Sequence, residues 1–80
     1  MTLDELRVGR SAHIIAIDET HPSSTQLCEM GLLPGESIEL ISKAPFGDPL
    51  KIEVMGYTLC LRKEDASAIR IELNQGGRHE

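Results

Sequence analysis

Three residues in the first half of the chain carry side chains that can bind a transition metal. His21 and Cys28 are seven positions apart, and Glu29 follows directly; seven positions correspond to about two turns of a helix. Imidazole, thiolate and carboxylate groups together suit Fe²⁺ or Zn²⁺. No pair among them has the i, i+3 or i+4 spacing of dense ligand clusters. A transition-metal-binding or metal-sensing module is therefore one hypothesis, although nothing in the sequence requires a cofactor.

The residue patterns of an enzyme are missing from the chain. Its serines, cysteines and three histidines have no recognisable nucleophile setting. No glycine-rich loop of the type that cradles phosphates opens a helix. A domain of 80 residues also has little room for a deep substrate pocket. We therefore expect a binding module with no catalytic residues.

The charge and hydrophobicity of the chain argue against binding to nucleic acid and against insertion into a membrane. The formal net charge is −5, and lysines and arginines form no cluster, whereas a nucleic-acid surface needs a basic patch. No stretch approaches the roughly 20 apolar residues of a membrane span. The first residues also lack the pattern of a signal peptide. We expect a cytoplasmic protein that does not insert into the membrane, with Cys28 and Cys60 reduced; whether these two cysteines meet stays open.

Short runs of alternating apolar and polar residues, separated by turn residues, make up most of the chain. This alternation is typical of half-buried strands. Pro34-Gly35 suits a type II turn, and Gly56-Tyr57 predicts a tight II′ hairpin. Gly31 is well placed to end the preceding helix in a left-handed conformation. The expected strands are 12–17, 36–43, 50–55, 58–62 and 69–73, with a helix at 22–30 and helical turns at 2–6 and 63–68.

These elements predict one domain with a single core, because chains this short seldom hold two. Five short strands reduce their exposed edges by coiling into a closed or nearly closed sheet. The expected fold is mainly β with short helices: a small five-stranded SH3-like barrel with a helical insertion between strands 1 and 2. We expect the domain to cover residues 1–74 and residues 75–80 to form a disordered tail.

Apolar residues at the turns are the candidates for contact with a protein partner. Burial in the core is least certain at such positions, and exposed apolar patches mark interaction surfaces. In the alternative interpretation, Leu32 and Phe46 close the ends of the barrel. The acidic balance of the chain favours a basic partner surface. The predicted contact residues are Leu27, Met30, Leu32, Leu33, Pro34, Pro45 and Phe46.

The order and spacing of several of these motifs resemble the FeoA family, the small cytosolic proteins of bacterial ferrous iron transport. The motifs are Met30-Gly31-Leu32, Pro34-Gly35, the segment 44–50 (APFGDPL) and Gly56-Tyr57. The resemblance implies an accessory protein that binds and modulates a FeoB-like membrane transporter with a G domain, at the cytoplasmic side of the inner membrane. A homo-oligomer that pairs through open sheet edges is a further hypothesis.

Overall fold

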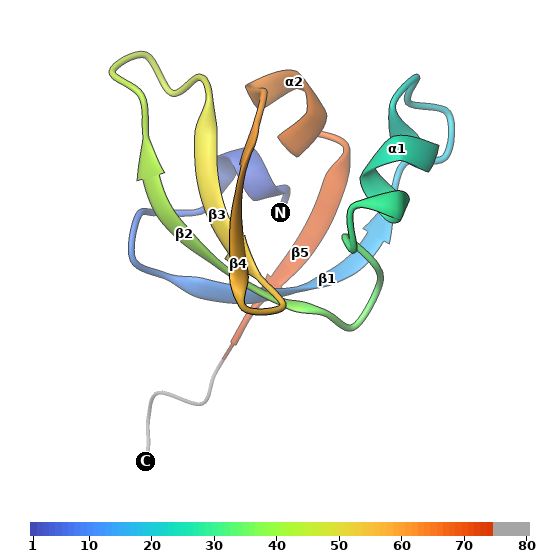
Figure 1. Cartoon of the computed structure of the whole chain (residues 1–80), viewed down its shortest axis with the longest axis horizontal. Coiled ribbons are helices and arrows are strands. Elements are labelled where there is room, and N and C mark those ends of the chain that lie inside the picture. Colours follow the sequence, from blue (N-terminus) through green and yellow to red (C-terminus); the bar gives the residue numbers. More distant parts are fainter. Residues whose placement is uncertain (75–80) are drawn as a thin grey trace.

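The structure is a computed structural model that describes residues 1–74 of the 80-residue chain. The predicted tail, residues 75–80, lies outside the described residues. Residues 1–74 form five strands and three short helical segments (Figure 1). In chain order these are the 3₁₀ helix η1 (Leu3–Glu5), β1 (Ser11–Ile17), α1 (Ser24–Glu29), β2 (Ser37–Lys43), β3 (Leu50–Val54), β4 (Tyr57–Leu61), α2 (Lys63–Ala66) and β5 (Ile69–Leu73).

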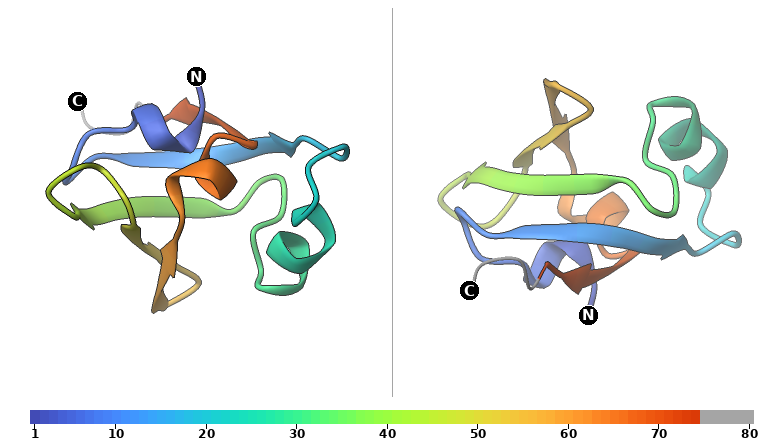
Figure 2. Two further views of the ribbon diagram at one scale, coloured as in Figure 1. Left: turned by 90° about the horizontal axis from the view of Figure 1, so that it is seen from above. Right: turned by 90° about the horizontal axis from the view of Figure 1, so that it is seen from below.

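All five strands belong to one antiparallel sheet with the order β4-β3-β2-β1-β5. The pairing shifts between Ile14 and Ala16 of β1 and between Leu40 and Ser42 of β2; such irregularities bend a strand and increase its twist. The sheet therefore coils. Strands β3 and β4 extend from one side of the central pair β2 and β1, and β5 extends from the other side (Figure 2). The predicted five strands, and the helix inserted between the first two, are confirmed.

The core lies inside the coiled sheet and follows from the alternation of side chains along the strands. In β3, Leu50, Ile52 and Val54 are buried, while Lys51 and Glu53 are exposed. Burying each such aliphatic side chain contributes about 1.5–3 kcal/mol to stability. The other buried strand residues are Ala12, Ile14, Ile38, Leu40, Leu61, Ile69 and Ile71, and the short helices and loops add Leu3, Leu6, Leu27, Leu32, Ala66 and Ala68.

The hairpin between β3 and β4 turns one residue earlier than the sequence predicts. Its central residues are Met55 (φ 54°) and Gly56 (φ 84°), and Tyr57 is the first residue of β4, paired with Val54. Two positive φ angles in a two-residue loop make a type I′ turn, so the expected II′ turn at Gly56-Tyr57 is wrong. The expectation failed because a methionine seldom adopts a positive φ, whereas the inward alternation of β3 and β4 demands this register.

The C-terminal end of α1 is a Schellman motif built on Gly31. The amide of Leu32 donates to the carbonyl of Leu27 (3.2 Å), and the amide of Gly31 donates to that of Cys28 (3.0 Å). Gly31 has a φ of 97°, which glycine adopts without the steric cost of a Cβ. The motif directs Leu27 and Leu32 together into the core, where both are buried, and so fixes the short helix to the barrel.

Replacing Gly31 by alanine should lower the free energy of unfolding by about 1–2 kcal/mol, the cost of a left-handed L-residue. A Cβ there would also lie 2.9 Å from Met55 Sδ and 3.4 Å from Tyr57 Oη. Gly35 is the matched control, because its φ is 94° but a Cβ would meet nothing within 4 Å. Urea unfolding gives the loss in free energy of unfolding for each variant. A larger loss for Gly35→Ala than for Gly31→Ala would contradict this account.

Candidate partner-binding surface

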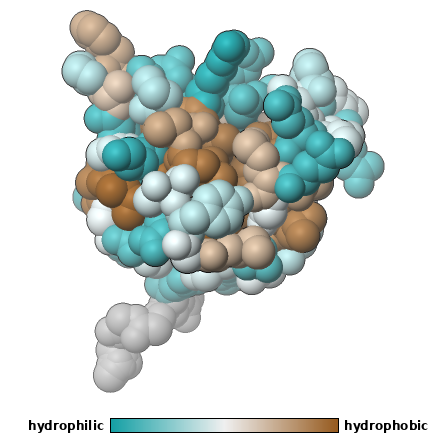
Figure 3. Space-filling view, viewed as in Figure 1, coloured by the Kyte–Doolittle hydropathy of each residue, from teal (hydrophilic) through white to brown (hydrophobic). Residues whose placement is uncertain are grey.

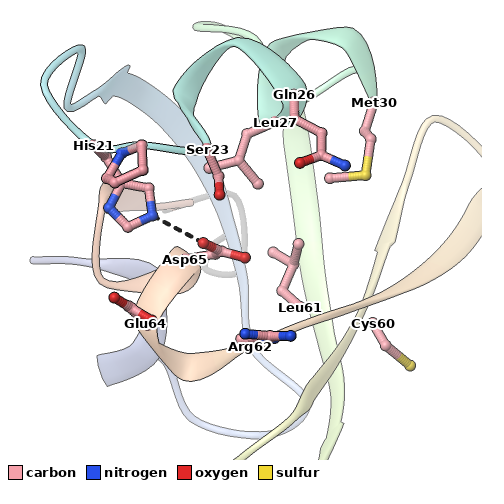
Figure 4. Close-up of a pocket in the computed structure, with 11 residues that line it drawn as sticks. His21, Ser23, Gln26, Leu27, Met30, Cys60, Leu61, Arg62, Glu64 and Asp65 are labelled. Atoms are coloured by element: carbon pink, nitrogen blue, oxygen red, sulfur yellow. Dashed lines mark hydrogen bonds and ion pairs between the residues drawn. The ribbon is translucent and has the colours of Figure 1, made fainter.

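A groove of about 480 Å³ separates α1 from β4 and α2. Hydrophobic residues reach the surface near the middle of this face, between α1 and β4, with hydrophilic residues around them (Figure 3). Leu27 and Met30 extend from the α1 side toward Leu61 of β4, and Cys60 and Arg62 lie on the opposite side of the groove (Figure 4). The groove therefore has an apolar floor and a polar border.

Two hydrogen bonds, one at each end of the groove, attach the α1 segment to the rest of the molecule. At one end, the Tyr57 hydroxyl at the start of β4 donates to the carbonyl oxygen of Met30. At the other end, His21 Nε2 lies 2.8 Å from Asp65 Oδ1 of α2 (Figure 4). Both partners of the second bond are largely shielded from water, where such a contact is stronger than on an open surface. The width of the groove is thus set by side chains on both of its ends.

The loop between β2 and β3 presents an exposed aromatic side chain on an ordered backbone. The loop projects from one end of the sheet (Figure 1), and Phe46 in it is 94% exposed. The Gly47 amide donates to the Ala44 carbonyl (2.7 Å), and the Ala44 amide donates to the Pro49 carbonyl (3.0 Å). An exposed aromatic residue on a preorganised turn loses little conformational entropy when a partner buries it. This loop is therefore suited to protein contact.

A side chain of the same loop also holds the helix beside it. Asp48 Oδ1 accepts a hydrogen bond from the Lys63 amide (2.9 Å) at the start of α2. This amide is one of the helix N-terminal donors that have no partner within the helix itself. The contact joins the loop to α2, which also carries Asp65 at the end of the groove.

The predicted contact residues do not form one surface. Leu27 and Leu32 are 1% and 0% exposed, so in this fold they pack in the core and are not available to a partner. Met30 is partly buried and borders the groove. The alternative that Leu32 closes the barrel agrees with its burial, whereas the same alternative for Phe46 does not agree with its exposure.

The exposed members of the predicted set form two separate groups. Leu33 and Pro34 precede β2, whereas Pro45 and Phe46 follow it, and all four are exposed. A strand of seven residues separates the two groups, which corresponds to roughly 23 Å. The sequence could not show this separation, because strand direction and turn exposure are properties of the folded sheet.

The candidate metal ligands are not brought together. His21 borders the groove and contacts Asp65, whereas Cys28 faces a different hollow lined by Ile17, Glu19 and Pro34. Within residues 1–74, no group of three or more His, Cys, Asp and Glu side chains could hold a metal ion. His21 and Cys28 therefore do not share one ligand set in this structure, and metal binding with His21, Cys28 and Glu29 as candidates stays a prediction. Cys28 and Cys60 are free thiols.

Asp18 stabilises the turn between β1 and α1 through its carboxylate. Its Oδ1 accepts hydrogen bonds from the Thr20 hydroxyl (2.7 Å) and the Thr20 amide (3.0 Å). These bonds hold the pKa of the Asp18 carboxyl below its ordinary value of 3.8, because they favour the charged form. The turn leads directly to His21, so the carboxylate helps to position one end of the groove.

The stabilisation from Asp18 should depend on pH in a defined direction. A folded-state pKa below the unfolded value means that the contribution is present above pH 3.8 and is lost as the pH falls through the folded-state pKa. Asp18→Asn retains an acceptor oxygen but does not titrate. When the pH is lowered from ~5 to ~2.5, the thermal midpoint of the wild type should therefore decrease more than that of Asp18→Asn. An equal fall in both proteins would contradict the assignment.

Sequence reasoning missed the residues that shape the groove. The sequence predicts Tyr57 in a hairpin turn, Arg62 at the end of strand 58–62 and Asp65 in the helical turn 63–68. No local pattern distinguishes a tyrosine that reaches a carbonyl 27 positions away, or an aspartate that meets a histidine 44 positions away. Only the order of the strands brings these segments together.

Comparison with known proteins identifies the family of this chain. A family model described as the FeoA domain matches residues 1–73. The chain is 36% identical over 73 residues to the Fe(2+) transport protein A/Fe(2+) transporter FeoB fusion protein of Porphyromonas gingivalis. That match covers 91% of this chain but only 9% of the relative, so the chain corresponds to a small part of the fusion protein.

Solved structures of similar proteins share the fold. An FeoA-like protein from Clostridium acetobutylicum matches with a TM-score of 0.89 and 30% identity, over 100% of this chain and 93% of that one. Stenotrophomonas maltophilia FeoA complexed with zinc, described as an SH3 domain protein, matches with a TM-score of 0.78 and 29% identity. The second match covers 90% of this chain and 89% of that one. The predicted SH3-like fold is confirmed.

No helix among the described residues is both long and apolar enough to cross a membrane.

Proposed function

Because this chain belongs to the FeoA domain family, we propose that it is an accessory protein of bacterial ferrous iron uptake that binds and modulates a FeoB-like membrane transporter at its cytoplasmic side. The family is a non-catalytic transport accessory domain. The observation that carries the proposal is the fusion of a 36% identical domain to FeoB in Porphyromonas gingivalis. Covalent linkage keeps two partners at a high effective concentration, which supports direct contact between them.

The β2–β3 loop is the part of the surface that we assign to this contact. Phe46 is 94% exposed, and the loop backbone is held by its own hydrogen bonds and by the bond between Asp48 and Lys63. Aromatic anchors of this kind dominate the energetics of protein interfaces. Leu33 and Pro34, at the other end of β2, form a second and separate candidate contact.

Modulation requires that the domain bind two states of the transporter with different affinity. A ligand with equal affinity for both states shifts no equilibrium, however tightly it binds. The transporter's nucleotide cycle supplies such states, and binding that favours one of them would bias transport. A metal-binding role is not proposed, because His21 contacts Asp65 while Cys28 faces another hollow.

Binding to the full-length transporter in detergent, with and without guanine nucleotide, tests the proposal. We expect saturable binding whose dissociation constant changes with the nucleotide bound. Saturable binding with the same constant in every nucleotide state would support docking but contradict modulation. No binding in any state would contradict the proposal as a whole.

A further inference from the structure

The two edges of the sheet differ in how they are covered. The outer edge of β5 is occupied by the chain's first residues, since Thr2 bridges to Arg70 and the Ile71 amide donates to the Met1 carbonyl (2.9 Å). The opposite edge is β4, which pairs only with β3. No described residue provides β4 with a second partner strand. The sheet therefore ends at an open strand.

The register of the hairpin shows which backbone groups of β4 are unpaired. In a two-residue hairpin the residues that flank the turn, here Val54 and Tyr57, exchange hydrogen bonds, and such pairs then alternate along the ladder. The groups of Leu59 and Leu61 consequently face β3. The N–H and C=O groups of Thr58 and Cys60 point away from it and have no backbone partner among the described residues.

Strand β4 has no charged residue or proline that would prevent another strand from pairing with it. Natural edge strands are usually protected by charged residues, proline or a covering segment. The sequence of β4, Tyr57–Leu61 (YTLCL), contains no charge and no proline, whereas β5 carries Arg70 and Glu72 as well as its cover. An unprotected edge in an otherwise protected sheet indicates a site of strand addition.

The groove runs along this open edge. Cys60, Leu61 and Arg62 form its β4 side, and α1 forms the other. Its volume of about 480 Å³ falls within the ~300–1,000 Å³ of ordinary ligand sites. The bonds from Tyr57 to Met30 and from His21 to Asp65 hold α1 in place across it. This space suits a single extended segment, because a whole second sheet would collide with α1.

We propose that the groove binds an extended peptide segment of a partner protein, which adds to β4 as an antiparallel strand. The backbone of the peptide would pair with Thr58 and Cys60, the main-chain mode of β-augmentation. Peptide side chains opposite Leu59 and Leu61 would point toward the α1 side, where the partly buried Met30 provides apolar contact. These alternate positions of the peptide should therefore be apolar.

Arg62 is the basic residue on the β4 side of the groove, whose α2 side carries Glu64 and Asp65, the latter in contact with His21. Arg62 follows β4 with an extended backbone (φ −70°, ψ 149°), so alternation continues and its side chain shares a face with Cys60. Arg62 is exposed and makes no ion pair with any residue in 1–74. An acidic peptide residue opposite Arg62 would complete the peptide pattern. In the N-to-C direction this pattern is acidic, apolar, any residue, apolar, any residue.

This surface is separate from the Phe46 loop, so it does not depend on the docking proposed above.

A synthetic peptide pair tests the main-chain pairing. The probe is acetyl-Glu-Val-Thr-Val-Thr-amide, whose third residue would face Cys60. N-methylation of the third residue removes the N–H that points at Cys60, whereas N-methylation of the fourth residue removes one that points away. In ¹⁵N NMR titrations, the parent and the fourth-residue variant should shift the Thr58 and Cys60 amides, and the third-residue variant should not. Equal behaviour of the two variants would overturn the proposal.

Charge reversal and a backbone substitution provide two independent checks. A peptide that begins with lysine should bind about two- to five-fold more weakly, the effect of one surface ion pair. Cys60→Pro, which removes the outward N–H of an edge strand, should abolish binding, while Cys60→Val should retain it. No parent binding at ~1 mM, the weak end of measurable affinity, would overturn the proposal. So would Thr58 and Cys60 shifts that follow protein concentration rather than peptide, because a second copy would then occupy the edge.

Discussion

Phe46→Ala should weaken binding to a FeoB-like transporter by about 30-fold or more, because truncating an interface anchor costs about 2 kcal/mol or more. Folding should be unaffected, since the side chain is 94% exposed and contributes almost nothing to the core. The turn that carries it is formed by backbone bonds that the substitution leaves in place. Titration of the variant against the full-length transporter in detergent gives the ratio of dissociation constants.

Met55→Ala is the matched control for this experiment. Met55 is also an exposed apolar side chain, at 61%, and it lies in the hairpin at the opposite end of β3. If the β2–β3 loop is the contact, Met55→Ala should change the dissociation constant by less than about two-fold, within the range of neutral positions. A similar loss of affinity in both variants would indicate nonspecific hydrophobic binding. No loss of affinity for Phe46→Ala would show that the loop is not part of the interface.

Leu32→Ala should lower the free energy of unfolding by about 2–5 kcal/mol, the range for deleting a buried leucine side chain. Leu32 is 0% exposed and packs in the same core cluster as Leu27 at the end of α1. For a domain of this size each kcal/mol corresponds to roughly 4–8 °C in thermal midpoint. The expected fall is therefore at least about 8 °C, measurable by circular dichroism.

The neighbouring residue provides the control. Leu33 has the same side chain one position later but is 44% exposed, so Leu33→Ala should change stability by no more than about 0.5 kcal/mol. Comparable losses in the two variants would contradict the burial of Leu32. Together, the two experiments separate binding from folding: the Phe46 variant is expected to change partner binding only, and the Leu32 variant is expected to change stability.

Local patterns in the sequence were sufficient for the elements and for the class of fold. Period-two alternation in segments such as 50–54 reflects which side chains face the core, and it predicted all five strands. Gly31 and Gly35 marked chain reversals because their positive φ angles are costly for other residues. The order of the turn motifs indicated the family that residues 1–73 match. Each of these signals is local, so it is present in the linear chain.

Exposure at the turns was decided only by the tertiary structure. Leu32 and Phe46 look alike in sequence, as apolar residues beside a turn with glycine or proline. The Schellman end of α1 directs Leu32 inward, whereas the β2–β3 loop carries Phe46 away from the sheet. The difference depends on where each loop stands relative to the coiled sheet, which is set by strand pairing far along the chain.

The sequence by itself determined the strands, the class of fold and the family, because alternation, backbone preference and motif order are properties of neighbouring residues. The tertiary structure alone decided that His21 meets Asp65 rather than Cys28, that Tyr57 holds α1, and that β4 is left as an open edge beside a groove. These features arise from contacts between residues far apart in the chain. Such contacts form only when the whole sheet closes, and no local pattern encodes them.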